Sequence, residues 1–279
     1  MKTHNWKTNY FSTLQSEIDK IKEEGHYRIF NNIERKAGQF PKATRHHNGS
    51  TEEIDVWCSN DYLGMSQNPF VIDAMKQAAE KLGAGSGGTR NISGTTNFHI
   101  QLEKEIAALH QKERALAFNS GYSANESALK SIISAFDNCL VLSDELNHAS
   151  LIEGIRASKK EKAIFRHNDV KHLKDILQGV EFSRPKIIVL ESVYSMEADF
   201  APLEDVIEVA QDNGALIYLD EVHAPPQGNA IAAFLPSKLR PVPPPSTRPK
   251  SHLPPDAIYW LSRQARSNSD QCQPDQTHR

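Results

Sequence analysis

Short apolar runs alternate with amphipathic stretches through the middle of this 279-residue chain. The runs are too short for helices and predict strands, whereas the amphipathic intervals predict helices. Because strands this apolar are buried on both faces, the repeated strand–helix order predicts an α/β fold with a mostly parallel sheet. The five predicted strands are Ala115–Phe118, Cys139–Leu142, Ala163–Phe165, Lys186–Leu190 and Ala215–Leu219.

Three helices are predicted before the first of these strands. Leu14, Ile18 and Ile21 share one face of a helix over residues 11–24. Asn68 and Pro69 provide a cap and a first helical residue for a second helix, and a third covers about residues 97–109. We therefore expect an N-terminal segment over residues 1–60 and a large α/β domain over residues 61–224.

The composition changes after residue 224. Most of the 15 prolines lie beyond this point, several of them in the run 241–249. A proline run can form polyproline II but no β-ladder, and residues 262–279 are polar without periodicity. We expect residues 225–279 to form neither helix nor strand and to be disordered. A ligand for an SH3-type domain is the alternative interpretation.

Charge and cysteine content narrow the class of protein. The formal charge of −3 is spread along the chain, so the sequence indicates neither nucleic acid nor an anionic membrane as a partner. No apolar run approaches the roughly 20 residues needed to span a bilayer, and no apolar segment follows the N-terminus as in a secretory signal. The three cysteines are scattered, which is typical of a reducing compartment. These features predict a soluble cytoplasmic protein.

The glycine-rich stretch 83–96 allows close backbone approach to a ligand. A P-loop is the obvious interpretation, but no glycine of the chain is followed by lysine, so the GxxxxGK[ST] motif is absent. A dinucleotide-binding fingerprint also fits badly, because these glycines follow a predicted helix and not a first strand.

Polar residues follow each predicted strand, where ligands bind in sheets of this kind. Gly121 and Tyr122 lie where the first strand turns into a helix, and free N–H groups at such a turn favour a phosphate. An ordinary strand–helix turn is the alternative. The other strand ends carry Ser143-Asp144, Arg166-His167, Glu191-Ser192 and Asp220-Glu221.

Six segments together resemble one enzyme family. They are WCSNDYLGM (57–65), GAGSGGTRNISGTT (83–96), SDELNHASLIEGIR (143–156), IFRHND (164–169), ESVYSMEADFAPL (191–203) and DEVHA (220–224). From about residue 27 to residue 224 the chain resembles the 5-aminolevulinate synthases, which are α-oxoamine synthases of the fold-type I pyridoxal 5'-phosphate (PLP) enzymes. The RNISGTT run favours the 5-aminolevulinate synthases over the other α-oxoamine synthases. The resemblance implies the large domain of that fold, incomplete because the small C-terminal domain is missing.

The resemblance implies PLP as the cofactor and assigns residues to it. Asp220 is similar to the carboxylate under the pyridine nitrogen, His148 to the imidazole stacked on the ring, and His223 to the histidine at the phenolic oxygen. A buried anion at the pyridine nitrogen keeps the ring protonated, which makes the cofactor an effective electron sink. These three are the expected catalytic residues, and the expected cofactor-binding set is Gly121, Tyr122, His148, Ser195, Asp220 and His223.

The resemblance also implies glycine and succinyl-CoA as substrates. Arg28 is similar to the arginine that clamps the succinyl carboxylate, a task suited to a bidentate donor, and Asn60 to the asparagine that orients glycine. No metal is expected. The remaining expected contacts are Thr89, Asn91 and Ile92, which close around the acyl group from the partner subunit, and Ser143 and Lys162 at the CoA part.

The family's lysine, which forms the Schiff base with PLP and acts as a base, is expected about thirty residues after His223. That position falls in Ser251–Pro254, with a proline where the lysine is expected, and no predicted strand holds Lys238 or Lys250. We therefore expect the chain as written to be inactive. A shifted reading frame is one hypothesis for the tail. Two later strands of the family's seven-stranded sheet would be lost, and the exposed edges predict poor solubility.

The family's reaction condenses glycine with succinyl-CoA to 5-aminolevulinate, CoA and CO2, on the way to tetrapyrroles and heme, in a homodimer. Two alternatives remain open for this chain. It could be a non-catalytic subunit that pairs with an intact synthase, or another α-oxoamine synthase.

Overall fold

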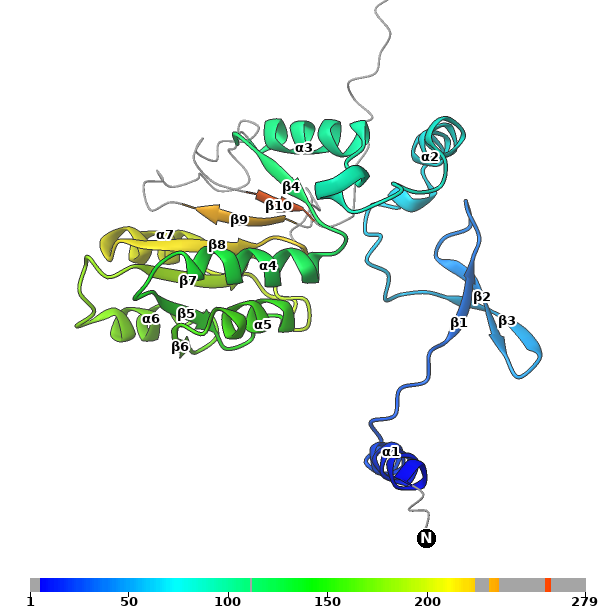
Figure 1. Cartoon of the computed structure of the whole chain (residues 1–279), viewed down its shortest axis with the longest axis horizontal. Coiled ribbons are helices and arrows are strands. Elements are labelled where there is room, and N and C mark those ends of the chain that lie inside the picture. The colour runs from blue at the N-terminus through cyan, green and yellow to red at the C-terminus, as the bar shows by residue number, and fades with distance from the viewer. Residues whose placement is uncertain (1–5, 111, 224–230, 236–258, 262–279) are drawn as a thin grey trace, which may run out of the picture. The chain divides into compact units, whose positions relative to one another are not determined.

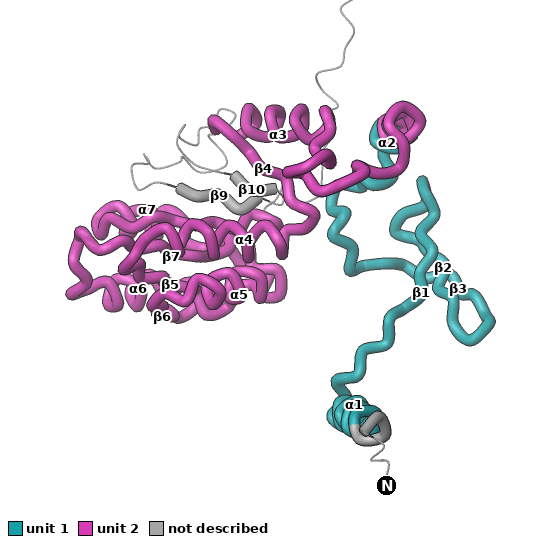
Figure 2. Tube along the Cα trace, in the orientation of Figure 1, with its two compact units in different colours: residues 1–72 teal, residues 73–279 magenta. Residues whose placement is uncertain are grey.

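The computed structural model describes residues 6–110, 112–223, 231–235 and 259–261. The chain divides into two compact units, residues 1–72 and residues 73–279 (Figure 2). This division after Ile72 lies twelve residues beyond the end expected for the N-terminal segment, and the domain boundaries at residues 60 and 224 stay predictions.

The first unit holds one helix and a small antiparallel sheet. The predicted first helix is α1 (Trp6–Glu23), and it is followed by β1 (Asn32–Arg35), β2 (Lys42–His47) and β3 (Ser50–Asp55) in the order β1-β2-β3. Asn48 and Gly49 join β2 to β3 with positive φ angles of 48° and 77°, as a two-residue hairpin turn requires. A short 3₁₀ turn, Met65–Gln67, follows the sheet, and the unit ends in the first turn of the next helix.

The second unit contains a seven-stranded sheet in the order β4-β10-β9-β8-β7-β5-β6 (Figure 1). The five strands predicted from apolar runs are all present, and the pairs β5·β6, β5·β7 and β7·β8 are parallel as predicted. Their bounds are β4 (Ala115–Ala117), β5 (Leu140–Asp144), β6 (Glu161–Phe165), β7 (Lys186–Glu191) and β8 (Ala215–Asp220).

Helices cover both faces of this sheet, because alternate strand residues point to opposite sides. Val141, Ile187 and Tyr218 pack against one pair of helices, α4 (Gly121–Ser134) and α5 (Ala149–Ser158). Leu142 and Ile188 pack against the other pair, α6 (Val170–Leu177) and α7 (Leu203–Asp212). The remaining helical elements are α2 (Pro69–Leu82), the π-helical turn Arg90–Gly94 and α3 (Asn97–Leu109).

The tail departs from our expectation that residues 225–279 contain no strand. β9 (Ile231–Leu235) pairs antiparallel with β8, and β10 (Tyr259–Leu261) lies between β9 and β4. The prolines led us to expect no strand here, but the tail also contains two short apolar runs, IAAFL and YWL. Such runs can pair with the free edge of a sheet. The edge of β8, which we expected to be exposed, is therefore paired.

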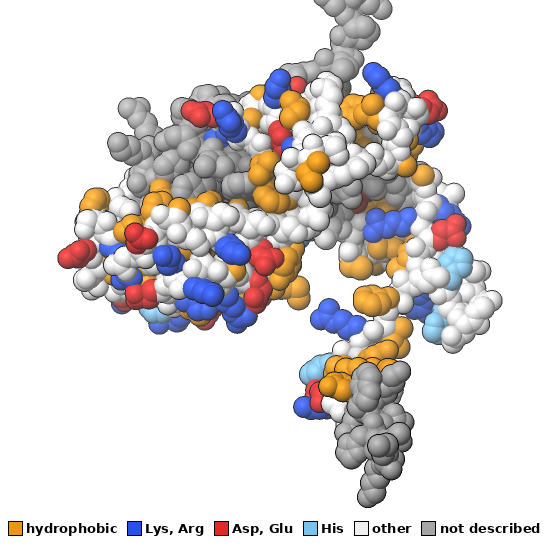
Figure 3. Space-filling view, viewed as in Figure 1, with side chains coloured by type: hydrophobic (Ala, Val, Ile, Leu, Met, Phe, Trp, Pro, Cys, Tyr) orange, Lys and Arg blue, Asp and Glu red, His pale blue; other side chains and the backbone are white. Residues whose placement is uncertain are grey.

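Large apolar side chains are nevertheless exposed in both units (Figure 3). Phe30 and Trp57 are 91% and 90% exposed in the first unit, and Ile92 is 83% exposed in the second. Within the described part of the chain, the helices are all too short or too polar to cross a membrane.

Candidate functional site

The candidate site lies where β7 and β8 end at their carboxyl termini. Glu191 and Asp220 are opposite each other in the register of these two strands, and both are the last residues of their strands. The two carboxylates are 3% and 4% exposed. Two acids buried side by side raise the free energy of the folded chain unless protons, hydrogen bonds or a cationic ligand compensate.

Asp220 accepts two hydrogen bonds. The Nδ2 of Asn125 donates to its Oδ2 at 2.7 Å, and the backbone N–H of Val222 donates to its Oδ1 at 2.9 Å. Burial raises the pKa of Asp220 above its ordinary value, and these two hydrogen bonds only partly oppose that effect. In the described residues, no lysine or arginine forms an ion pair with Asp220.

Asn125 connects Asp220 to His148. The Tyr218 hydroxyl donates to Asn125 Oδ1 at 3.0 Å, and Asn125 Nδ2 also donates to Ser150 Oγ at 2.9 Å. Ser150 Oγ lies 2.7 Å from His148 Nδ1, and the Ser150 N–H donates to the same nitrogen at 3.2 Å. Because Nδ1 accepts this bond, the proton of the neutral imidazole is on Nε2.

Two further predicted residues lie near His148 and Asp220. The rings of Tyr122 and His148 meet edge to face, with centroids 6.3 Å apart. His223 is half-buried, which lowers its pKa, and the charge of Asp220 opposes this effect. Tyr122 also follows Gly121 at the start of α4, where Ser120 Oγ accepts the Ser123 N–H at 3.1 Å. The first turn of a helix has N–H groups without partners inside the helix, which suits a phosphate.

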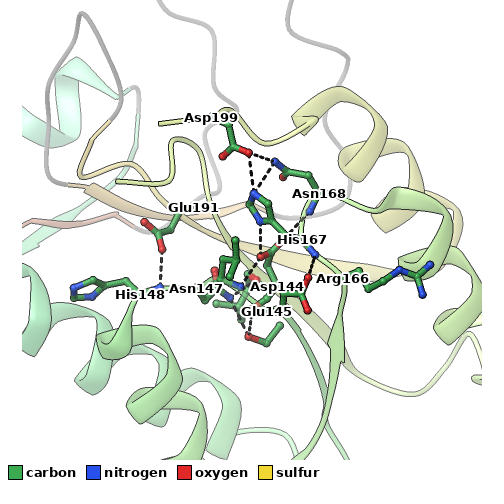
Figure 4. Close-up of polar contacts among 12 residues, drawn as sticks. Asp144, Glu145, Asn147, His148, Arg166, His167, Asn168, Glu191 and Asp199 are labelled. Atoms are coloured by element: carbon green, nitrogen blue, oxygen red, sulfur yellow. Dashed lines mark hydrogen bonds and ion pairs between the residues drawn. The ribbon is translucent and has the colours of Figure 1, made fainter. Parts of the chain in front are cut away.

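Glu191 holds the segment that carries His148. Its Oε1 accepts the backbone N–H of His148 at 2.6 Å (Figure 4). Burial, and next the charge of Asp220, raise the pKa of Glu191 to about 7. The neighbouring Asn147 donates to Ser143 Oγ at 2.9 Å and to the Val189 carbonyl at 2.8 Å, so His148 is fixed between β5 and β7.

The structure thus brings five of the six expected cofactor residues together: Gly121, Tyr122, His148, Asp220 and His223. Ser195 is exposed on the loop that follows β7. The positions expected for the family's lysine, 251–254, and the alternatives Lys238 and Lys250 lie outside the described residues. All of these assignments remain predictions.

The expected substrate residues are divided between the two units. Arg28 and Asn60 belong to the first unit, and Lys162 is exposed on β6. Ser143 is buried, with Asn147 donating to its hydroxyl. In the glycine-rich stretch, Thr89 Oγ1 donates to Asn91 Oδ1 at 2.7 Å.

Three residues of the site, Asn125, Ser150 and Tyr218, were not predicted, and Glu191 was expected only as a polar residue at a strand end. Asn125 lies one helical turn after Gly121, so its side chain could have been expected near the strand ends. Ser150 is part of the same NHAS run as His148. Nothing in the local sequence indicated that Asn125 and Ser150 would bond to each other across 25 residues.

Comparisons with known proteins agree with this geometry. The model of the family "Aminotransferase class I and II" matches residues 52–229. The 5-aminolevulinate synthase of Rhodobacter capsulatus is 50% identical over 229 residues, which are 80% of this chain and 56% of that protein. The enzyme of Rhizobium meliloti is 50% identical over 228 residues, with the same coverage. The chain therefore spans about half the length of the curated relatives it matches.

Solved structures show the same fold. Serine palmitoyltransferase from S. paucimobilis, with PLP and myriocin bound, is 32% identical with a TM-score of 0.65 over 77% of this chain and 53% of its own. The enzyme of Sphingomonas wittichii is 30% identical with a TM-score of 0.65, over 76% and 52%. The α/β unit therefore has the large-domain fold of fold-type I PLP enzymes, in part. The chain belongs to the aminotransferase class I and II family and, over the part it covers, is similar to 5-aminolevulinate synthases.

Proposed function

We propose that this chain binds PLP at the carboxyl ends of β7 and β8 and belongs to a 5-aminolevulinate synthase. The observation that carries the proposal is Asp220, a buried carboxylate joined to His148 through Asn125 and Ser150. Among the described residues this carboxylate has no lysine or arginine partner, and a buried carboxylate of this kind suits the protonated nitrogen of a pyridine ring. The residues present therefore fit the cofactor.

Each residue of this set has a distinct task in the proposal. Asp220 holds the proton at the pyridine nitrogen, and the start of α4 at Gly121 and Tyr122 binds the phosphate. His148 presents its imidazole to the ring face, and His223 donates to the phenolic oxygen. When bound, PLP supplies the electron sink for chemistry at the α-carbon of glycine.

The proposed reaction is the condensation of glycine with succinyl-CoA to 5-aminolevulinate, CoA and CO2. Arg28 would bind the succinyl carboxylate, Asn60 would orient glycine, and Ser143 and Lys162 would contact CoA. Because Pro254 stands where the family's lysine is expected, we expect the chain as written to bind PLP without completing this reaction alone.

A PLP titration tests the cofactor site. Saturable binding is followed by the absorbance of PLP for the full chain, with Asp212→Ala as a control, since Asp212 is exposed at the end of α7. We expect Asp220→Ala to weaken binding at least about tenfold, as expected when a charged partner is lost, and Asp212→Ala to leave it unchanged. Equal affinities of the two variants would reject the site. Formation of 5-aminolevulinate by the chain alone would refute its expected inactivity.

We further propose that the chain associates with a second copy of itself or with an intact synthase. Ile92 is 83% exposed beside Thr89 and Asn91, and Ile29 and Phe30 are 81% and 91% exposed beside Arg28. Apolar side chains this exposed are typical of surfaces that a partner covers. Light scattering measures the mass of the particle in solution. A monomer that stays monomeric when mixed with an intact synthase would refute both forms of association.

A further inference from the structure

The loop after β7 is closed into a small hairpin, residues 193–200. Val193 and Phe200 form an isolated antiparallel bridge, and the Tyr194 N–H donates to the Asp199 carbonyl at 3.1 Å. Ala198 turns the chain with a φ of 58°, and its N–H donates to the Tyr194 carbonyl at 2.9 Å. This 193–200 hairpin carries Ser195, one of the expected cofactor residues.

His167 lies between two carboxylates, one of which belongs to the hairpin (Figure 4). Its Nδ1 is 2.9 Å from Oδ1 of Asp144 at the end of β5, and its Nε2 is 2.9 Å from Oδ2 of Asp199. An ionised carboxylate can only accept, so both ring nitrogens must carry protons for both bonds to form, and the Asn168 amide nitrogen, 3.1 Å from Nε2, then donates to Asp199. The geometry therefore calls for the charged imidazolium, with its side chain only 16% exposed.

The two sides of this bridge differ in how firmly they are held. The Asp144 side chain is 1% exposed and accepts N–H groups from Leu146 at 2.9 Å and Asn168 at 3.0 Å, so it is fixed to the sheet edge. The Asp199 side chain is 45% exposed and is reached by His167 and, at 3.3 Å, by Asn168 Nδ2. The ring of Tyr194 also contacts the ring of His167 edge to face, with the two ring centroids 4.4 Å apart.

We propose that His167 is a positioning residue whose imidazolium fastens the 193–200 hairpin to the end of β5 and thereby sets the place of Ser195. The role given to Ser195 rests on the proposed function, whereas the fastening itself does not. His167 touches neither substrate nor cofactor in this proposal and acts only through the hairpin.

The charges around His167 favour its protonated form. Burial lowers its pKa, but the bonds to Asp144 and Asp199 and the charges of both carboxylates raise it, and the net shift is upward. A raised pKa in the folded state means that the bridge is complete at low pH and is lost as the pH rises through that pKa. Glu145 also lies at this site, and its Oε1 accepts the backbone N–H of His167 at 2.8 Å. The other titratable groups around the site are Tyr194, Arg166, Asp169, His172 and, beyond Asp144, Glu191.

Amide hydrogen exchange of the full chain without PLP tests the fastening. Protection factors of the peptide spanning 193–201 are compared for the wild type, His167→Gln and Asp199→Asn. His46→Gln is the matched control, because His46 bonds to one carboxylate, Glu34, on the surface of the first unit at 3.0 Å. We expect both hairpin variants to lose about tenfold or more in protection, the size of a lost charged hydrogen bond, and the control to lose none.

The same loss of protection is expected in the wild type as the pH is raised. Unchanged protection in both hairpin variants would overturn the proposal. If His167→Gln fails to fold, the result for Asp199→Asn alone tests the proposal, since Asp199 is on the surface.

PLP titration of the same variants separates the two proposals. A wild type that binds no PLP refutes the proposed function, and hydrogen exchange still judges the fastening. In a chain that binds PLP, a loose hairpin with several-fold weaker affinity supports the placing of Ser195, and a loose hairpin with unchanged affinity overturns it.

Discussion

At the scale of single residues, the two acids that suit the site to PLP also lower the free energy of unfolding of the chain without a ligand. Asp220 and Glu191 are buried next to each other, and burial raises the pKa of both carboxyl groups. Groups arranged in this way destabilise the chain that lacks a ligand, and active sites commonly show that compromise. Replacing either acid should therefore have opposite effects on folding and on PLP binding.

Asp220→Asn keeps the size of the side chain and removes its charge. We expect the variant without PLP to unfold at a higher temperature than the wild type, because no ionised carboxylate has to be buried. Its affinity for PLP should fall at least about tenfold, because the neutral amide no longer balances the pyridinium charge. Thermal unfolding and PLP titration of one preparation measure both effects. A variant less stable than the wild type would contradict this account.

Glu191→Gln tests the pH dependence. Glu191 has a pKa of about 7 in the folded chain against 4.5 as its ordinary value, so its contribution to stability is present at acid pH and is lost as the pH rises from about 4.5 through about 7. Glutamine can still accept the His148 N–H but does not titrate. We expect the variant to gain roughly 2 to 4 kcal/mol over the wild type between pH 4.5 and pH 8, measured by urea unfolding. If the difference in unfolding free energy between the variant and the wild type is the same at pH 4.5 and at pH 8, the raised pKa of Glu191 is wrong.

Sequence reasoning could identify Asp220, His148 and Gly121 because they follow apolar runs or lie in recognisable motifs. It could not identify His167 as a bridge, because Asp199 comes 32 residues later and lies on a loop. Contacts of this kind depend on how the hairpin folds back on the sheet, and a single sequence does not show that.

At the scale of elements, the glycine-rich stretch depends on one close approach. A Cβ at Gly94 would overlap the carbonyl oxygen of Gly88, so the π-helical turn between them closes only with glycine at this position. Arg90 in that turn forms an ion pair with Glu103 of α3 and donates to the Ala117 carbonyl at 3.0 Å. The expected acyl contacts Thr89, Asn91 and Ile92 are thus fixed to α3 and β4.

Gly94→Ala should open this turn, and Gly85→Ala is the matched control, because a Cβ at Gly85 meets no atom within 4 Å. We expect Gly94→Ala to lower the free energy of unfolding by roughly 2 kcal/mol, as overpacking against rigid backbone does, and Gly85→Ala to leave it within about 0.5 kcal/mol. Denaturant unfolding measures both. Equal losses would mean that the stretch has no strict need for glycine at position 94.

The pattern of apolar residues predicted the elements of the α/β unit well, because buried parallel strands are apolar on both faces. The same reasoning passed over β1, β2 and β3, whose residues are polar and mostly exposed. Ala43 is the buried residue of β2, and one such position is too weak a signal for a strand. The Asn48-Gly49 pair is itself a hairpin signal, so the turn between β2 and β3 was predictable from the sequence.

At the scale of the whole molecule, the sheet includes strands from both sides of the change in composition. β9 pairs with β8 on one side and with β10 on the other, and β10 pairs with β4. The strand that ends at Asp220 therefore has neighbours on both edges, β7 and β9. β9 and β10 therefore support the strand that carries Asp220, even though the composition after residue 224 resembles that of a disordered tail.

Proline substitution in β9 distinguishes these two views of the tail. Ala232 lies opposite Asp220 and Trp260, and Ala233 lies opposite Leu219 and Tyr259. Consecutive N–H groups of a strand point to opposite neighbours, so Ala232→Pro and Ala233→Pro each remove a donor on a different edge. A strand paired on both sides loses a ladder bond in either case. We therefore expect both variants to unfold at lower denaturant concentration and to aggregate more than the wild type. A disordered tail would tolerate both prolines, and unchanged midpoints in the two variants would restore the expectation drawn from composition.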